Sequence, residues 1–254
     1  MPFPSLPSLL AVFAHPDDES LSAGGVLAQH AASGARTAVV TATWGADTHR
    51  AGELADALRI LGAGKPRLLG YADARVPESA VGRPRLCDAP LDDVVRQLVA
   101  HIREFRPEVL VTHDAYGGLT GHPDHIHTHR VTALAVQAAN WPHLYPDAGA
   151  PWQPRALYLA THPDSAAGAL GGRLLRPGRD SYSVPDEWVA AVIDVRPWIE
   201  TKLRAIAAHR SEVVRGALPG RLAALPFGER VRLLSTEWYV RHGAASPAPP
   251  RSAL

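Results

Sequence analysis

The stretch "SLLAVFAHPDDESLSAGGVLAQHAASG", residues 8–34, decides how the first half of the chain folds. Its apolar run at 8–14 stops abruptly at His15, which is typical of a short buried strand. After "HPDDES" the apolar residues recur at helical spacing, and Gly34 supplies a helix stop. A second apolar run, "ARTAVVTATWG" at 35–45, follows directly. This order predicts a strand–helix–strand unit, and such units form parallel sheets covered by helices.

The same alternation continues along the chain. Helical patterns occur at 50–64, 90–107, 123–140 and 196–213, and strand-like runs at 66–71, 108–114, 155–161 and 187–195. We therefore expect one α/β domain over residues 1–242, with a Rossmann-like, mostly parallel sheet, helices on both faces and C-terminal additions. The tail at 243–254, "GAASPAPPRSAL" from Gly243, is rich in Pro, Ala and Ser and is predicted to be disordered.

Composition excludes several classes of function. The hydrophobic fraction is 46%, the charged fraction 20% and the net charge +1, so no strong field favours nucleic acid or an anionic membrane. The apolar N-terminus lacks the basic residues of a signal peptide and is too short to span a bilayer. Cys87 is the only cysteine, which excludes an internal disulfide and a thiolate zinc site. We expect a cytoplasmic protein with a small-molecule substrate. The sequence does not decide between a monomer and a homo-oligomer.

Two clusters of His and Asp carry the candidate chemistry. "HPDDES" begins at His15, and the His-Pro-Asp of 15–17 recurs at 122–124 within "GGLTGHPDHIHTHRV". Proline keeps the preceding His out of the helical region and suits the first position of a helix, so the acids lie in a helical first turn. The helix dipole alone would favour acids there. A plain helix-start role therefore remains open for the acids of either cluster, above all for Glu19.

The predicted topology favours a shared site. In open parallel sheets ligands bind beyond the carboxyl ends of the strands, and both clusters leave a strand at that edge. If the two strands are neighbours, the clusters converge on one crevice. Imidazole and carboxylate together suit a divalent metal, above all Zn²⁺, with three protein ligands and one open position. Spare carboxylate and imidazole groups would then supply acid–base chemistry.

The pattern alone does not assign roles within each cluster. Asp17 and Asp18 are adjacent, so their side chains point differently, and one of them is expected to ligate. On the second helix His129 shares a face with the first histidine of the helix, whereas His127 lies on the opposite side. We expect both to stay outside the ligand set. His113 ends a strand and is a candidate for lining the pocket.

The quoted residues also carry a family resemblance. "AHPDDESLSAGG", "RAGELADALRILG", "LGYAD", "IREFRPEVLVTHD", "GHPDHIHTHRVT" and "KLRAIAAHRSEV" resemble the LmbE-like (PIG-L) family of zinc-dependent de-N-acetylases over most of the chain. The pattern is most similar to the branch that deacetylates N-acetylglucosaminyl-inositol in the biosynthesis of the low-molecular-weight thiol mycothiol. A related branch acts on N-acetylglucosaminyl-malate. The resemblance implies one Zn²⁺ per chain, with Fe²⁺ as an alternative at the same ligands.

The resemblance assigns roles that spacing does not. It implies that His15, Asp18 and His125 are the metal ligands. Asp17 would be the general base that deprotonates the attacking water.

Four further residues acquire roles in the same way. His122 would stabilise the oxyanion or protonate the leaving amine, oriented by Asp124. Arg50, in "HRAGEL", and Asp73, in "LGYAD", match residues that bind the hydroxyl groups of the substrate. A solvated helix-start Arg50 and a turn residue Asp73 are the alternatives from the sequence alone.

The chain departs from the family pattern at three places. A Tyr shortly before the second His-Pro-Asp is replaced by Thr120, and the nearest Tyr is Tyr116. The segment 44–50 is short, which predicts a more open pocket wall. A Lys typical of the mycothiol-conjugate amidases soon after "DDES" is absent, which argues against that branch.

We therefore expect a hydrolase that removes acetate from a small molecule containing N-acetylglucosamine, of the inositol or malate type. A deacetylase of another glycan or of an antibiotic glycoside is the main alternative. A phosphoesterase would need a second metal with more acidic bridges than the clusters offer. A non-catalytic zinc- or carbohydrate-binding protein is the remaining class.

Overall fold

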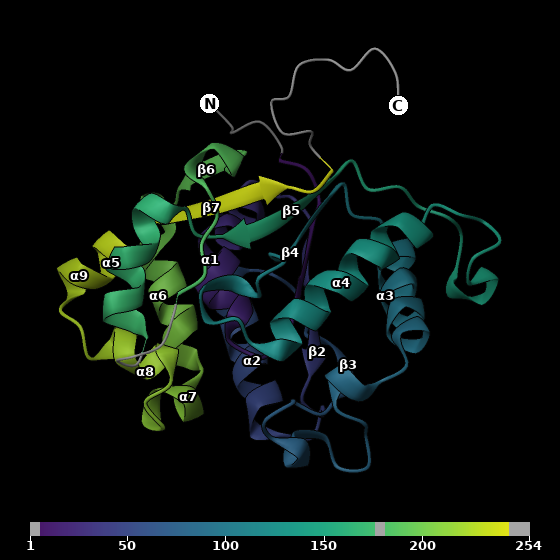
Figure 1. Ribbon diagram of the computed structural model, residues 1–254, viewed down its shortest axis with the longest axis horizontal. Helices are drawn as coiled ribbons and strands as arrows, with labels where there is room; N and C mark the ends of the chain where they lie inside the picture. Colours follow the sequence, from purple (N-terminus) through teal and green to yellow (C-terminus); the bar gives the residue numbers. More distant parts are fainter. Residues whose placement is uncertain (1–5, 176–180, 244–254) are drawn as a thin grey trace.

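A sheet of seven strands forms the centre of the described chain (Figure 1). The computed structural model describes residues 6–175 and 181–243. The strands are β1 (Leu9–Phe13), β2 (Thr37–Thr43), β3 (Arg67–Tyr71), β4 (Val109–His113), β5 (Ala156–Thr161), β6 (Ala191–Asp194) and β7 (Thr236–Arg241). Their order is β3-β2-β1-β4-β5-β7-β6, in which the first five strands pair in parallel and β7 pairs antiparallel with both neighbours. The expected mostly parallel α/β sheet is confirmed.

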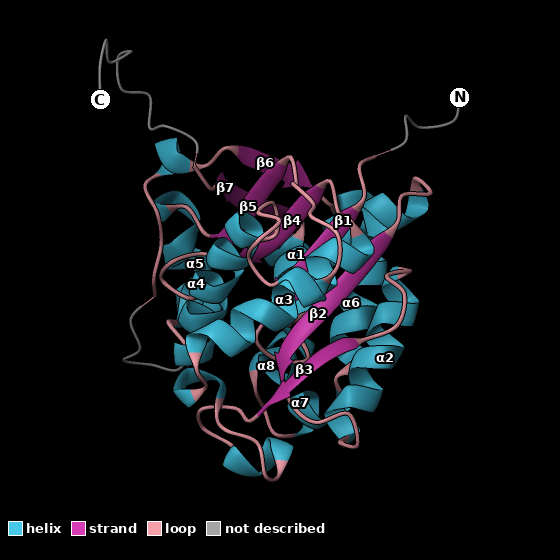
Figure 2. Cartoon of the chain, turned by 90° about the vertical axis from the view of Figure 1, so that its right-hand side faces the viewer, coloured by secondary structure: helices cyan, strands magenta, loops and turns pink. Residues whose placement is uncertain are grey.

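Helices cover both faces of this sheet (Figure 2). The first four are α1 (Asp18–Ala32), α2 (His49–Leu61), α3 (Leu91–Phe105) and α4 (Pro123–Ala138). The others are α5 (Asp164–Leu174), α6 (Ile199–Ala208), α7 (Arg210–Val214), α8 (Leu218–Ala223) and α9 (Phe227–Leu234). One apolar core lies between the sheet and α3–α4, and a second lies between the sheet and α1, α2 and α6.

The C-terminal additions form a third apolar cluster, in which leucines of α5, α8 and α9 pack on α6. Sequence patterning did not resolve these pieces. Helices α8 and α9 have 6 and 8 residues, too short for a clear period. The run at 187–195 was predicted as a strand, but only Ala191–Asp194 forms one, after a 3₁₀ turn at Asp186–Trp188. The helix predicted at 196–213 is interrupted at His209.

The centre of the sheet positions the site. Strand β1 pairs in parallel with β4, so the chain leaves both strands at the same edge. From β1 the chain runs through α1 to β2 on one side, and from β4 it runs through α4 to β5 on the other. This reversal of strand order is where open α/β sheets form a ligand crevice. No helix in the described ranges is long and apolar enough to cross a membrane, and the tail predicted to be disordered lies, from 244 on, outside them.

Candidate functional site

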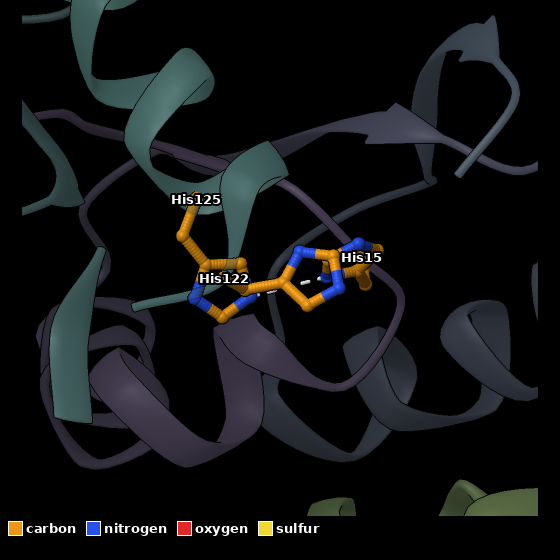
Figure 3. Close-up of side chains that lie close together, drawn as sticks. All are labelled: His15, His122 and His125. Carbon is orange, nitrogen blue, oxygen red and sulfur yellow. Dashed lines mark hydrogen bonds between the residues drawn. The ribbon is translucent and has the colours of Figure 1, made fainter. Parts of the chain in front are cut away.

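The His-Pro-Asp turns at 15–17 and 122–124 meet at this edge, as the pairing of β1 with β4 requires. His15 follows β1, and α1 begins at Asp18. His122 is the N-cap of α4, where its Nδ1 accepts the backbone N–H of Asp124 at 3.2 Å. The prediction from proline is confirmed at His122, which is extended and is followed by Pro123 at the start of α4. It is wrong at Pro16, because α1 begins only at Asp18 and Asp17 is not helical. His125 lies one turn further along α4, and its ring comes close to that of His15 (Figure 3).

His15, Asp18 and His125 place nitrogen and oxygen atoms of the kinds that bind metals in a triangle. His15 Nδ1 lies 3.1 Å from His125 Nε2 and 3.3 Å from Asp18 Oδ2, and His125 Nε2 lies 3.3 Å from Asp18 Oδ1. Ligands bound tetrahedrally at about 2.0–2.1 Å stand roughly 3.3 Å apart, which is the spacing found for zinc sites. Related groupings that include His113, His122 or Asp73 also lie within reach of one ion.

The hydrogen bonds behind the triangle fix the state of both rings. His15 Nε2 lies 3.1 Å from Asp124 Oδ2, and His125 Nδ1 lies 3.1 Å from the carbonyl oxygen of Gly117. Both partners accept, so these nitrogens carry the ring hydrogens. The lone pairs of His15 Nδ1 and His125 Nε2 then face each other and the Asp18 carboxylate. When both rings are neutral, three acceptors therefore face one another, and this arrangement fits a cation.

The charge of the cluster agrees with this assignment. Burial lowers the pKa of His15, but its hydrogen bonds to Asp124 and Asp18 outweigh that effect and raise the pKa to about 10. Without a metal, a proton on His15 therefore takes the place of the cation. The pKa of Asp18 is held well below its ordinary value by the nearby His125 and His113, against the effect of burial.

His113 supports the ligands from behind. Its Nε2 accepts the backbone N–H of Ala14 at 3.2 Å and lies 3.4 Å from Asp18 Oδ2. Its ring stacks on His125 with centroids 4.0 Å apart, and burial lowers its pKa to about 4. His129 Nδ1 donates to the carbonyl oxygen of His113 at 2.9 Å, so this ring turns toward the end of β4 rather than toward the triangle.

Asp17 projects into the site from a strained backbone. Its φ of 127° lies in a region that residues other than glycine rarely adopt, and such strain concentrates at functional positions. Burial raises the pKa of Asp17 to about 7, against the charge of Arg50, whose Nη2 lies 3.3 Å from Asp17 Oδ1. A carboxyl group with a pKa near neutrality is suited to general-base catalysis.

Glu19 and His209 hold this strained turn in place. Glu19 is fully buried, and its Oε2 accepts the backbone N–H of Asp17 at 3.0 Å. Its Oε1 lies 2.9 Å from His209 Nε2. Burial alone would raise the pKa of Glu19 and lower that of His209, but the pairing outweighs burial and shifts both pKa values the other way. Glu19 is therefore more than a helix-start acid. Its partner stands at the break between α6 and α7, which no spacing in the sequence indicates.

Arg50 is buried on the wall of the site. Its Nη1 lies 3.4 Å from Glu212 Oε1, its guanidinium stands over the Trp44 ring at 4.6 Å, and it donates to the carbonyl of Pro16. It lines the main cleft beside Asp17. The alternative of a solvated helix-start arginine is thus wrong.

Asp124 and Asp73 both contact His15, in addition to the contacts expected for them. The Asp124 carboxylate lies 3.1 Å from His15 Nε2 but 3.8 Å from His122 Nδ1. Burial would raise the pKa of Asp124, but the hydrogen bond and charge of His15 outweigh burial and lower the pKa to about 2. Asp73 Oδ2 also lies 3.3 Å from His15 Nε2. Among described residues, Asp73 is not part of the cleft wall. Both carboxylates therefore orient His15, a contact between distant segments that the sequence spacing could not indicate.

The cleft in front of the triangle has a volume of about 740 Å³. His15, Asp17, Asp18, His122 and His125 line its base. Besides Arg50, three further arginines lie on its walls, namely Arg75, Arg215 and Arg221. Burial and the charges of His15 and His125 lower the pKa of His122 to about 2, so this ring is neutral. Because its Nδ1 accepts from Asp124, Nε2 carries the hydrogen.

Comparison with known proteins identifies this arrangement. A family model described as PIG-L, GlcNAc-PI de-N-acetylase, matches residues 10–136, a range that contains both clusters. A deacetylase of Rhodococcus jostii that acts on 1D-myo-inositol 2-acetamido-2-deoxy-α-D-glucopyranoside is 40% identical over 81% of each chain. The chain belongs to the PIG-L family. The equivalent deacetylase of Mycolicibacterium smegmatis is 36% identical over 96% of this chain and 93% of its own.

Solved structures agree on the fold. The N,N'-diacetylchitobiose deacetylase of Pyrococcus horikoshii superposes with a TM-score of 0.65 over 94% of this chain and 85% of its own, at 19% identity. At that identity the likeness concerns the fold alone. The PIG-L assignment therefore rests on the family model and on the closer relatives in sequence, and it makes this protein a hydrolytic de-N-acetylase.

The PIG-L protein differs from the expected pattern at the mouth of its cleft. Tyr116 stacks on Tyr182 with centroids 6.0 Å apart, and of the two only Tyr182 belongs to the cleft wall among described residues. Thr120 also lines the cleft. The ring of Tyr182 packs against Gly121, beside His122. Tyr182 was missed because it lies 58 positions after the end of the motif at Asp124.

Proposed function

We propose that this PIG-L protein is a zinc-dependent deacetylase of N-acetylglucosaminyl-inositol. The observation that carries the proposal is the convergence of His15 Nδ1, His125 Nε2 and the Asp18 carboxylate, three acceptors within 3.3 Å of one another. Two imidazoles, one carboxylate and an open position suit catalytic Zn²⁺, with Fe²⁺ as an alternative. The names of relatives at 36–40% identity support the substrate.

Zinc at this site supplies a Lewis acid that polarises the acetamide carbonyl and acidifies water. Asp17, with a pKa of about 7, takes a proton from the attacking water. The neutral His122 donates its Nε2–H to the oxyanion that develops on the carbonyl. The C–N bond then breaks, acetate leaves, and Asp17 returns its proton to the amine. Of the two roles expected for His122, its low pKa favours oxyanion stabilisation over proton donation.

The charges near the cleft suggest how a sugar conjugate is held. Arg50 is fixed by Glu212 and Asp17 and presents its guanidinium to the cleft, where it can donate to hydroxyl groups. Asp73 stands behind His15 and is assigned to orienting that ring instead of binding substrate.

A second candidate substrate follows from Arg75, Arg215 and Arg221 on the cleft walls. Three guanidinium groups favour an anionic aglycone, as in N-acetylglucosaminyl-malate. Arg215 is paired with Glu212, which reduces this preference. A neutral inositol conjugate is therefore the first choice.

The test is acetate release from both conjugates by purified protein. The proposal predicts about one zinc per chain, activity abolished by a chelator and restored by Zn²⁺, and a higher kcat/KM for the inositol conjugate. Full activity after chelation would overturn the zinc mechanism. A higher kcat/KM for the malate conjugate would overturn the substrate.

A further inference from the structure

A second, smaller cavity adjoins the cleft at the metal triangle. Its volume is about 90 Å³. Asp18, His125, Leu21 and Thr120 line both the cavity and the cleft. The two spaces therefore meet at two of the three proposed metal ligands.

The exposed surface of the small cavity is mainly apolar, although His113, Thr161, His162 and Thr236 also line it. Eight of the described residues that line it are leucines, and Leu170, Leu222 and Leu233, on α5, α8 and α9, face this cavity but not the cleft. These three leucines belong to the buried cluster of the C-terminal additions. The charged pair in the wall is internally neutralised, since Lys202 Nζ lies 2.7 Å from Glu237 Oε1. Such a space favours an apolar group.

The residues proposed to act in the reaction line the large cleft and not the small cavity. Asp17, His122 and Arg50 line the cleft, and none of them is among the described residues of the small cavity. In the proposed reaction they contact the water, the oxyanion and the sugar. The remaining substituent of the reacting carbon is the carbon chain of the acyl group. The leucine-lined cavity, which Asp18 and His125 border, is the space that remains for that chain.

The size of the cavity exceeds what acetate needs. In the measure in which about 10–15 Å³ holds one water-sized group, 90 Å³ holds several such groups. An acetyl group places only one methyl beyond its carbonyl carbon. A butyryl group places three carbons there.

We propose that the cavity is an acyl pocket and that the enzyme also hydrolyses N-acyl amino sugars with propionyl and butyryl groups. This inference rests on the proposed deacetylase function. Water adds to the amide carbon, the C–N bond breaks, and the products are the free amine and the short-chain carboxylate. Each added methylene leaves water for an apolar wall, which is worth about fourfold in kcat/KM.

The test compares acetyl, propionyl and butyryl forms of glucosaminyl-inositol, measured by release of the free amine from zinc-loaded enzyme. The pocket predicts a kcat/KM for the butyryl form that exceeds that of the acetyl form. A butyryl form slower than the acetyl form would overturn the acyl pocket and leave the deacetylase function intact. Absence of any cleavage of the acetyl form would overturn the proposed function itself.

A pocket-filling variant provides the second arm. Leu222→Phe should lower the ratio of butyryl to acetyl kcat/KM at least about tenfold, because its ring occupies the space of the added methylenes. Leu222→Met is the matched control of similar volume and should keep the ratio. The ratio does not depend on the folded fraction of a preparation, since unfolding lowers both rates equally. An unchanged ratio in Leu222→Phe would contradict the proposal.

Discussion

His-Pro-Asp occurs three times in this chain, at 15–17, 122–124 and 162–164, and each copy follows a strand. The first two bring their rings into one cluster with carboxylates. The third follows β5, and its Asp164 accepts a hydrogen bond from Ser183 at the surface. His162 Nδ1 has no hydrogen-bond partner among the described residues. The tripeptide thus encodes a strand–turn–helix junction, and only the meeting of two copies beside β1 and β4 makes a site.

The largest difference should appear in metal content. His15→Ala removes a proposed ligand and should reduce bound zinc from about one to about zero per chain, because two ligands no longer close the site. His162→Ala removes the same residue from the third copy and should retain the metal. Elemental analysis of both proteins checks this prediction. Equal zinc content in the two variants would contradict the claim that the first copy binds the metal and the third does not.

The acids of the first and third copies should differ almost as much. Asp17→Asn should lower kcat about 10²–10⁴-fold while zinc stays bound, because the amide cannot take a proton from water. Asp164→Asn alters a surface hydrogen bond and should leave kcat unchanged. Steady-state rates with the acetylated conjugate decide the matter. A fully active Asp17→Asn would refute the assignment of the base.

Asp124, the acid of the second copy, contacts the ring of His15, the histidine of the first copy. Asp124→Asn should weaken zinc affinity about 10–100-fold, because the carboxylate no longer fixes the His15 tautomer. Competition with a chelator of known affinity measures the change. Unchanged affinity with a slower kcat would indicate that Asp124 serves His122, as the sequence first suggested.

The smallest expected effect is a shift in pH dependence. Burial raises the pKa of Asp17 and the charge of Arg50 lowers it, and together they give a pKa of about 7. Arg50→Gln removes that charge, so the acidic limb of the kcat profile should move to higher pH. Arg59→Gln, on the exposed face of α2, is the matched control and should leave the limb in place. A shift to lower pH in Arg50→Gln would contradict the proposed electrostatics.

The sequence predicted the sheet and the two clusters because their signals are local. An apolar strand, a proline after histidine and a helical period are each readable within about fifteen residues. The contacts of Asp124 and Asp73 with His15, and the Glu19–His209 pair, join residues 58 to 190 positions apart and carry no local signature. Strand β7 and helices α8 and α9 were missed since their stability comes from packing on α6 and β5.

The central claim is that two imidazoles, from the loop after β1 and from α4, share one ion with Asp18. X-ray absorption at the zinc edge of the zinc-loaded protein counts imidazole ligands directly. The structure predicts two imidazoles with oxygen completing the shell, and one imidazole in His125→Ala refilled with excess zinc. Three imidazoles in the wild-type protein would mean that His113 or His122 also ligates the ion, and would contradict the assignment.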